Sequence, residues 1–387
     1  MPVPFTLPMQ FPGYQNVYIP GYMGDSESQK KLLIGFALNE ESIALNKWIT
    51  VVPSDSPRAF YPVFNSSDFV RLKNITGNDR RWADAAERPS AGPGVRFMNR
   101  EFLLQRYGES TFVGNMAEDW SQIGSLVTLN QEQLASRALV WRSILAAATV
   151  TDPTKYITTA TPAATDNYFA TWAAFTTAVA GVGKPYASGY FGTGLYTGTV
   201  TTPVVKRFLG HCCKGIALRT NNRVGVKDLL FLVNPTTALK LAATEEFQYY
   251  IAQQAGSLAV LKGENPNYID PTYGLPDALY NLKVVSDPTS YTLGAPQQSA
   301  SVPDFAGQQF VIPDDFIAVL SRPGSVAGMK NSRGFSSVVL FQETKRALKP
   351  STFPDPRSER MEVAIQDMFT TDMVAPDCSF AIGSAVA

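Results

Sequence analysis

The alternation of hydrophobic and polar positions predicts one long helix near the middle of the chain. Apolar residues recur at helical spacing through TLNQEQLASRALVWRSILAAAT, and Asn130 with Gln133 forms a capping signature near its start. We therefore expect a helix over residues 130–149, about 30 Å long. Its polar face, opposite the apolar stripe, would consist of Gln131, Glu132, Arg137 and Arg142.

The second half of the chain predicts strands that alternate with short helices. VKDLLFLVN is typical of a buried strand, and Asn234 followed by Pro235 starts a helix directly after it. Thr244 would cap a further helix that Gly256 closes. Further strands are expected at LKVVSD, FIAVLSRP, FSSVVLFQ and RSERMEVAIQDMFTTDM. The pattern favours an α+β fold with mostly antiparallel strands.

Between these two regions, residues 150–205 have only four charged side chains and are rich in Thr, Ala, Gly and Tyr. Asp166 would cap a short helix within TDNYFATWAAFTTAVAG. The following YFGTGLYTGTVTT is typical of a loop and an edge strand.

Residues 1–24 have no charged side chain, and five prolines are interspersed with aromatic residues there. Because proline is incompatible with a helix interior, we expect an extended arm. Its aromatic side chains would be buried only against another surface, of the same subunit or of a neighbour, and the alternative is a disordered tail. The candidates for inter-subunit contact are Phe5, Phe11, Tyr14 and Tyr18.

A long polar stretch lies between Tyr61 and Phe97, flanked by the strand-like segments AFYPVF and VRFMN. It has too few apolar residues for a core of its own, so we expect a projecting β-loop. Arg80, Arg81 and Arg88 form a basic cluster on this loop. They would either pair with carboxylates of a partner or remain solvated.

The charge balance narrows the function classes. The 387 residues include 33 Lys and Arg against 33 Asp and Glu, and 17% are charged where about 25% is usual. A net charge of zero argues against a strongly basic nucleic-acid-binding protein. Few charges together with 11% aromatic residues indicate a surface that partners cover.

Cysteine spacing and targeting patterns favour a protein of a reducing compartment. The three cysteines lack the paired spacing of a disulfide framework or a zinc ribbon. No apolar run reaches the roughly 18 residues that cross a bilayer, and the first residues lack the pattern of a signal peptide. We expect no membrane association.

Candidate chemistry is sparse. His211 lies beside Cys212 and Cys213, but three consecutive side chains point in different directions, and no second histidine is available as a base. Asp314 and Asp315 are adjacent at an expected turn, and the glycines of GTGLYTG lack the spacing of a dinucleotide site. We expect no catalytic residue, no cofactor and no metal. The alternative is a soluble α+β hydrolase that uses His211 or the Asp314 region.

The order of these features resembles the major capsid protein of tailed bacteriophages, with the Hong Kong phage capsid fold and its lambda-type branch. The similarity covers the chain from about Arg58 to its C-terminus. It rests on AFYPVFNSSDFVRL, on VRFMNREFLLQRYGESTFVGNMAEDW leading into the predicted long helix, on NNRVGVKDLLFLVNPTTALKLAATEEFQYYI, and on FVIPDDFIAVLSRPG with SRGFSSVVLFQ. These segments match the family in type and order, without a catalytic signature.

The resemblance implies an α+β capsid fold divided into five regions. They are an N-terminal arm and leading segment (1–57), an extended E-loop (58–97), a peripheral domain (98–204) with helix 130–149 as its spine, a mainly axial domain (205–345) and a return to the peripheral domain (346–387). Arg137 and Arg142 on the spine helix are further candidates for inter-subunit contact. No pair of residues suits a lysine–asparagine cross-link.

The function implied by the resemblance is structural. Subunits would assemble as hexamers and pentamers into an icosahedral head around double-stranded DNA, in the virion and, during assembly, in the host cytoplasm. Implied partners are other copies of the chain, a portal, a decoration protein and non-specifically contacted DNA. A separate scaffolding protein is also implied, because the N-terminal region contains no long charged coiled-coil segment. A bacterial nanocompartment shell of the same fold is the second alternative.

Overall fold

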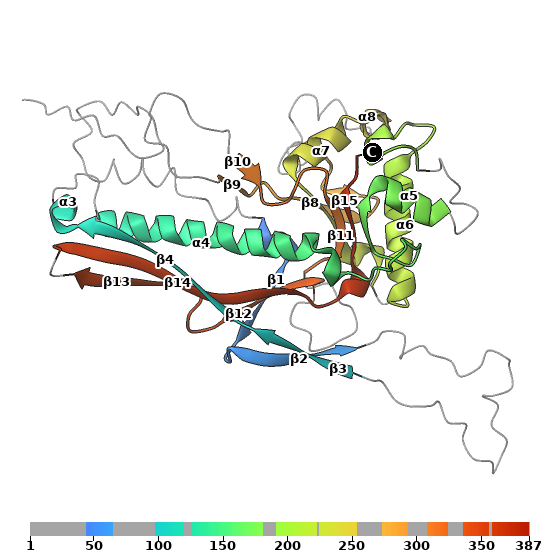
Figure 1. The fold of residues 1–387 in the computed structure, drawn as a ribbon. Coiled ribbons are helices and arrows are strands. Elements are labelled where there is room, and N and C mark those ends of the chain that lie inside the picture. Colours follow the sequence, from blue (N-terminus) through green and yellow to red (C-terminus); the bar gives the residue numbers. More distant parts are fainter. Residues whose placement is uncertain are drawn as a thin grey trace, which may run out of the picture.

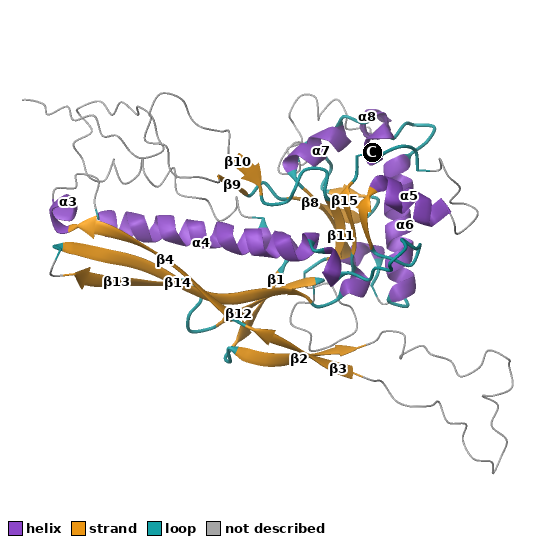
Figure 2. Ribbon diagram, viewed as in Figure 1, coloured by secondary structure: helices purple, strands orange, loops and turns teal. Residues whose placement is uncertain are grey.

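The computed structural model describes residues 44–64, 97–119, 125–180, 191–222, 224–253, 273–292, 308–323, 336–355 and 358–386 of the 387-residue chain. These residues form an elongated part, which contains one long helix, and a compact part, which contains most of the shorter helices (Figure 1). Each part contains its own β-sheet (Figure 2).

The elements range from single turns to a helix of 26 residues, α4, which is about 39 Å long. The described helices are α2 (Leu45–Trp48), α3 (Asn115–Asp119), α4 (Leu126–Thr151), α5 (Trp172–Ala180), α6 (Val204–Arg219), α7 (Pro235–Ala242) and α8 (Glu245–Gln253). The described strands are β1 (Thr50–Ser54), β2 (Arg58–Phe64), β3 (Phe97–Leu103), β4 (Gln105–Gly114), β5 (Tyr168–Thr171), β6 (Leu229–Val233), β7 (Ala278–Leu279), β8 (Leu282–Ser286), β9 (Ser290–Thr292), β10 (Gln308–Phe310), β11 (Ile317–Ser321), β12 (Val338–Glu343), β13 (Lys349–Asp355), β14 (Arg360–Met373) and β15 (Phe380–Ser384).

The sheet of the elongated part is organised around β14. Phe369 of β14 pairs with β12 and also with β4, so these two strands lie on opposite edges of β14. The first half of β14 pairs with β13 and with β4, which places β13 on the same edge as β12. β1 extends the sheet by pairing parallel to β12. All the other pairings in this sheet are antiparallel.

Helix α4 covers one face of this sheet. Alternate residues of β14 face the helix because side chains of a strand alternate between the two faces. Val363 and Ile365 pack with Leu134 near the start of the helix, and Phe369 packs with Ala146 near its end. The buried stripe of α4 and the inner face of β14 therefore form one continuous contact.

The opposite face of the sheet is covered in part by the antiparallel ribbon of β2 and β3. Phe102 of the ribbon stacks on Phe341 of β12, with ring centroids 4.1 Å apart, and Tyr61 stacks on the same ring at 5.5 Å. The Tyr61 hydroxyl donates a hydrogen bond of 2.7 Å to Oδ2 of Asp372. The ribbon is thereby anchored at its root by an aromatic stack and one polar contact.

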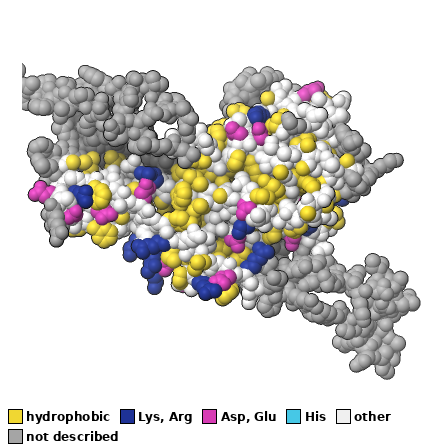
Figure 3. Space-filling view, viewed as in Figure 1, with side chains coloured by type: hydrophobic (Ala, Val, Ile, Leu, Met, Phe, Trp, Pro, Cys, Tyr) yellow, Lys and Arg dark blue, Asp and Glu magenta, His cyan; other side chains and the backbone are white. Residues whose placement is uncertain are grey.

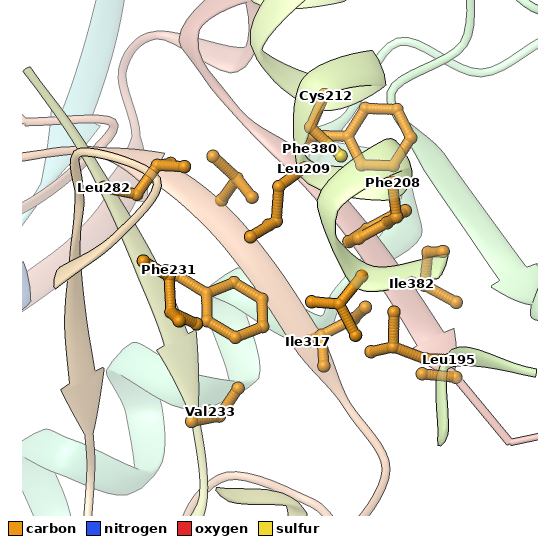
Figure 4. Close-up of a cluster of buried hydrophobic side chains, with 14 of the residues drawn as sticks. Leu195, Phe208, Leu209, Cys212, Phe231, Val233, Leu282, Ile317, Phe380 and Ile382 are labelled. Carbon is orange, nitrogen blue, oxygen red and sulfur yellow. The ribbon is translucent and has the colours of Figure 1, made fainter. Parts of the chain in front are cut away.

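The compact part contains a six-stranded sheet in the order β5-β15-β11-β6-β8-β7. All five residues of β6 are buried, as expected for a central strand covered on both faces. One face packs against α5, α6 and α7 through a core that includes Phe208, Leu209, Phe231 and Phe380 (Figure 4). The other face shares a core with the end of α4 and with β12.

Helix α2 lies in this shared core between the two parts. Leu45, Trp48 and Ile49 are almost completely buried there. The indole Nε1 of Trp48 donates to Oδ2 of Asp287, directly after β8, at 3.0 Å. The chain leaves the core as β1 and joins the elongated sheet, so the first described residues connect both parts.

The long helix begins earlier and ends later than residues 130–149. Ser125 is its N-cap, with the hydroxyl accepting the N–H of Thr128, and Glu118 accepts the N–H groups of Leu126 and Val127. The predicted cap at Asn130 is wrong, because Ser125 caps the helix five residues earlier and Glu118 of the preceding helix stabilises the same start.

The expectation that Asp166 caps a helix is also wrong. The residues after it form strand β5, which pairs parallel to β15, and α5 starts only at Trp172. The carboxylate of Asp166 instead accepts the N–H groups of Thr159 and Ala163 within a turn. The predicted edge strand in YFGTGLYTGTVTT is wrong for its described residues, which form a 3-10 turn at Leu195–Thr197 and loops.

Other predictions for the second half are confirmed. β6, α7 and α8 follow one another as expected, with Asn234 accepting the N–H of Thr237 at the start of α7. β8, β11, β12 and β14 lie at the predicted segments, and antiparallel pairings outnumber parallel ones. Gly256 lies outside the described residues. Helix α6 was not predicted from the sequence.

Both sheets combine segments that are far apart in the chain. The compact part contains β5 and α5 together with β15. The elongated sheet contains β12, which lies between β11 and β15 of the compact part along the chain. The chain therefore passes between the two parts several times.

Candidate assembly surfaces

Most of the predicted contact residues lie outside the described residues, namely Phe5, Phe11, Tyr14, Tyr18, Arg80, Arg81 and Arg88. Arg137 is exposed on α4 and forms an ion pair with Glu109 of β4. The expectation that Arg142 lies on the exposed face is wrong. Its guanidinium is buried between helix and sheet, because Asp367 on the inner face of β14 supplies a matching carboxylate.

His211, Cys212 and Cys213 lie on α6 and form part of the compact core. The imidazole of His211 packs edge-on against Phe175 and Phe380, with centroids 5.4 and 6.1 Å away, and burial lowers its pKa to about 4. Burial raises the pKa of Cys213 to about 11 and that of Cys212 well above its usual value. Protonated thiols beside a weakly basic imidazole are poor nucleophiles.

The carboxylates of Asp314 and Asp315 take part in local structure. Asp315 has a φ of 62°, accepts hydrogen from Tyr196 at 3.2 Å and forms an ion pair with Lys240 at 2.8 Å. Asp314 accepts from the amide of Asn234 at 2.5 Å. Both carboxylates stabilise the turn into β11 beside the start of α7, as the sequence predicted for this turn.

The described ranges contain no group of His, Cys, Asp and Glu that could hold a metal ion. Within the same ranges, no helix has both the length and the hydropathy needed to cross a membrane.

The outer face of the β2–β3 ribbon exposes two large apolar side chains. Phe60 is 62% and Leu103 is 60% exposed, although both lie in regular strands. Arg58 and Glu101 alternate with them on the same face and form an ion pair with each other. We call these four residues the ribbon patch.

A second exposed patch lies at the far end of the elongated sheet, on the face opposite α4. Glu362 of β14 pairs directly with Phe112 of β4 and with Phe353 of β13, so the three side chains form one row across the sheet. Phe112 and Phe353 are 50% and 56% exposed. The guanidinium of Arg360 lies 4.0 Å from the Phe112 ring centroid. We call Phe112, Phe353, Arg360 and Glu362 the sheet patch.

Basic side chains lie on the same face, between the two patches. Arg106 donates to Oε1 of Gln366 at 3.2 Å, and Lys349 is the neighbour of Gln366 on β13. Lys345 and Arg346 extend from the turn between β12 and β13. Figure 3 shows Lys and Arg side chains gathered at one place on the lower side of the elongated part. This face therefore combines exposed aromatic rings with a local excess of positive charge.

Sequence reasoning did not single out the two patches. Apolar and polar residues alternate along each of their strands, as in a strand that is buried on one face. This pattern does not reveal which face a neighbouring element covers. The only available signal was the low charge of the whole chain, which indicated a partly covered surface without locating it.

No known protein-family model and no curated protein sequence matches this chain. Solved structures do. A phage-related protein from Bordetella bronchiseptica RB50 is 12% identical with a TM-score of 0.50, and the match covers 92% of this chain and 96% of that one. The capsid structure of cyanophage P-SCSP1u is 11% identical with a TM-score of 0.50, covering 89% of each chain.

An encapsulin from Synechococcus elongatus is more remote, with 10% identity, a TM-score of 0.38, and coverage of 87% of this chain and 85% of that one. The mixed helix and strand architecture, matched over most of the chain, is that of phage capsid proteins. The capsid fold expected from the sequence is therefore confirmed.

Proposed function

We propose that the chain is the major capsid protein of a tailed bacteriophage, of the lambda-type branch, and that it assembles into hexamers and pentamers of an icosahedral head. The capsid fold supports this proposal. The observation that carries it is the presence of two separate exposed apolar patches on one subunit, the ribbon patch and the sheet patch.

The two patches lie at different places on the subunit and have similar chemistry. Each combines two large apolar side chains with one acidic and one basic residue. A contact between unlike surfaces of identical subunits is head-to-tail, and such a contact closes into a ring when the rotation between subunits allows it. Hexamers and pentamers are rings of this kind.

The energy of one such contact is modest. Burial of a Phe or Leu side chain contributes about 1.5–3 kcal/mol, against roughly 4–15 kcal/mol for the freedom lost on association. Each subunit makes many such contacts in a ring and in a lattice of rings. The assembled shell can therefore be stable although a single contact is weak. The N-terminal arm and leading segment (1–57) and the E-loop (58–97) would add further contacts.

The remaining partners follow from the same proposal. A separate scaffolding protein, a portal and a decoration protein would join the shell, and double-stranded DNA would fill it in the virion. Zero net charge suits a subunit that must not collect nucleic acid before assembly, because non-specific binding grows with the number of neutralised phosphates.

The test is assembly of purified protein, with and without its scaffolding protein, followed by electron microscopy and sedimentation. Phe353→Glu in the sheet patch and Phe60→Glu in the ribbon patch should each abolish capsomers while the unfolding midpoint stays within about 4 °C, since both side chains are exposed. Leu239→Glu, at an exposed position on α7, is the matched control and should assemble normally. Normal capsomers from both patch variants would contradict the head-to-tail contact.

The particle contents separate this proposal from its alternatives. Shells that enclose DNA support a phage head, whereas shells that enclose an enzyme would indicate a nanocompartment. A protein that stays monomeric under all conditions, and that loses a hydrolytic activity on His211→Ala, would favour the hydrolase.

A further inference from the structure

The contact between α4 and the elongated sheet is mostly apolar. Leu134 packs with Val363 and Ile365 of β14 near the start of the helix, and Ala146 packs with Phe369 near its end. Burial of apolar surface is non-directional, whereas a hydrogen-bonded ion pair has a defined geometry. The apolar contact alone therefore distinguishes between neighbouring registers of the helix less sharply than a polar contact does.

One buried ion pair lies within this apolar contact. Nε of Arg142 donates to Oδ2 of Asp367 at 2.6 Å, and Nη2 donates to Oδ1 at 2.7 Å. The two side chains are only 7% and 3% exposed. A bidentate fork fixes the relative orientation of its partners as well as their distance. The guanidinium carbon also lies 5.3 Å from the centroid of the Phe369 ring, which restricts it further.

The same carboxylate binds the segment that links β12 to β13. Oδ1 of Asp367 accepts the N–H of Leu348 at 3.3 Å. One side chain thereby connects α4, β14 and the turn that carries Lys345 and Arg346. A change in the position of Asp367 would move this basic turn together with the helix.

A second polar contact lies further along the same two elements. Oγ1 of Thr149 and Oγ1 of Thr371 are 2.7 Å apart. Arg142 and Thr149 are two helical turns apart, about 10.5 Å, and Asp367 and Thr371 are about 13 Å apart along the strand. Two polar contacts at different positions along the same helix and strand restrict both the translation and the rotation of the helix on the sheet.

We propose that Arg142 and Asp367 are positioning residues that set the register of α4 on the sheet, and with it the angle at which the subunit presents the ribbon patch and the sheet patch. A buried ion pair is often no more stabilising than apolar side chains of similar volume, so its role here is geometric. The effect on particles rests on the proposed shell function, whereas the register is a property of the single subunit. A slip by one helical turn would displace the helix by about 5.4 Å.

The test replaces the pair by apolar side chains, Arg142→Met with Asp367→Leu, in the full-length protein. The unfolding midpoint should stay within about 4 °C of wild type. Amide hydrogens of α4 should exchange about tenfold faster or more, because the helix samples several registers. Particles should form with a broad range of diameters in electron micrographs. The matched control, Arg137→Met with Glu109→Leu, removes the exposed pair between α4 and β4 and should leave exchange and diameters unchanged.

Wild-type exchange in α4 together with uniform particles would overturn the proposal, and so would an equal effect in the control. Faster exchange in a protein whose wild type forms no particles would support the register assignment and reject the shell function. If the apolar pair does not fold, Arg142→Lys replaces it, since it keeps the charge but not the fork. Faster exchange in α4 of that variant supports the proposal, and wild-type exchange overturns it.

Discussion

At the scale of single residues, burial decides the behaviour of the titratable groups. The imidazole of His211 is surrounded by Phe175, Phe191 and Phe380, and burial lowers its pKa to about 4 from an ordinary value of 6.5. Its neutral form is thus favoured in the folded state. The stability that depends on this neutral form is complete above pH 6.5 and is lost as the pH falls toward 4.

Between pH 7 and pH 4.5, titration of His211 should lower the unfolding free energy of the wild type by about 2 kcal/mol. The variant His211→Gln has no titratable group at this position and should not show this loss. The measurement is urea unfolding of both proteins at the two pH values. The comparison between variants matters because burial raises the pKa of Asp287 and Asp377, and these carboxylates shift the stability in the opposite direction. An equal pH dependence in both proteins would contradict the assignment to His211.

At the scale of elements, the β2–β3 ribbon is attached to the elongated sheet at one short root. Tyr61 donates to Asp372, which also pairs with Lys155 at 3.1 Å. Burial and the nearby carboxylate raise the pKa of Tyr61, so that its hydroxyl remains a donor at all ordinary pH values. The hydrogen bond is therefore not lost through deprotonation of the phenol.

Replacement of Tyr61 by Phe should cost about 1–2 kcal/mol, because Asp372 loses one donor while the aromatic stack on Phe341 remains. The loss should be local, with faster hydrogen exchange in β2 and β3 and unchanged exchange in β6. Phe60→Ala, on the outer face of the same strand, serves as control. A uniform increase of exchange throughout the protein would show that the root has no special role.

Element prediction from the sequence succeeded where the signals were local. Asn234 and Pro235 lie at the start of α7 as predicted, and both act within one turn. Helix α6 has apolar residues at helical spacing, but its N-terminus is capped by Glu246, which accepts the N–H groups of Val205 and Lys206 at 3.0 Å. Glu246 lies some forty residues later in the chain, so no local sequence pattern predicts this cap. Arg142 was misplaced for the same reason, because its partner Asp367 is 225 residues away.

At the scale of the whole molecule, the two patches and the low charge describe a subunit with much surface to cover. The described part leaves Phe60, Leu103, Phe112 and Phe353 at least half exposed. The uncharged segment 1–24 contributes further aromatic residues. We therefore expect partners to cover the ribbon patch and the sheet patch, among the described residues.

Deletion of residues 1–24 should abolish assembly and leave the unfolding midpoint unchanged, because the proposed function has this uncharged, proline-rich segment bind to neighbouring subunits. The measurement is calorimetry of the truncated protein together with sedimentation. Unimpaired shells from the truncated protein would remove the arm from the assembly mechanism.

The placement of α2 and β1 has a consequence for the order of events during synthesis. β1 pairs with β12, whose residues follow it by almost 290 positions, and β4 pairs with β14, whose residues follow it by about 250 positions. Pairings between such remote segments form late, because the closure of long loops precedes any gain from them. The elongated part therefore matures only when nearly the whole chain has left the ribosome. A nascent subunit presents no complete sheet patch to its neighbours, so assembly on unfinished chains is delayed by the topology itself.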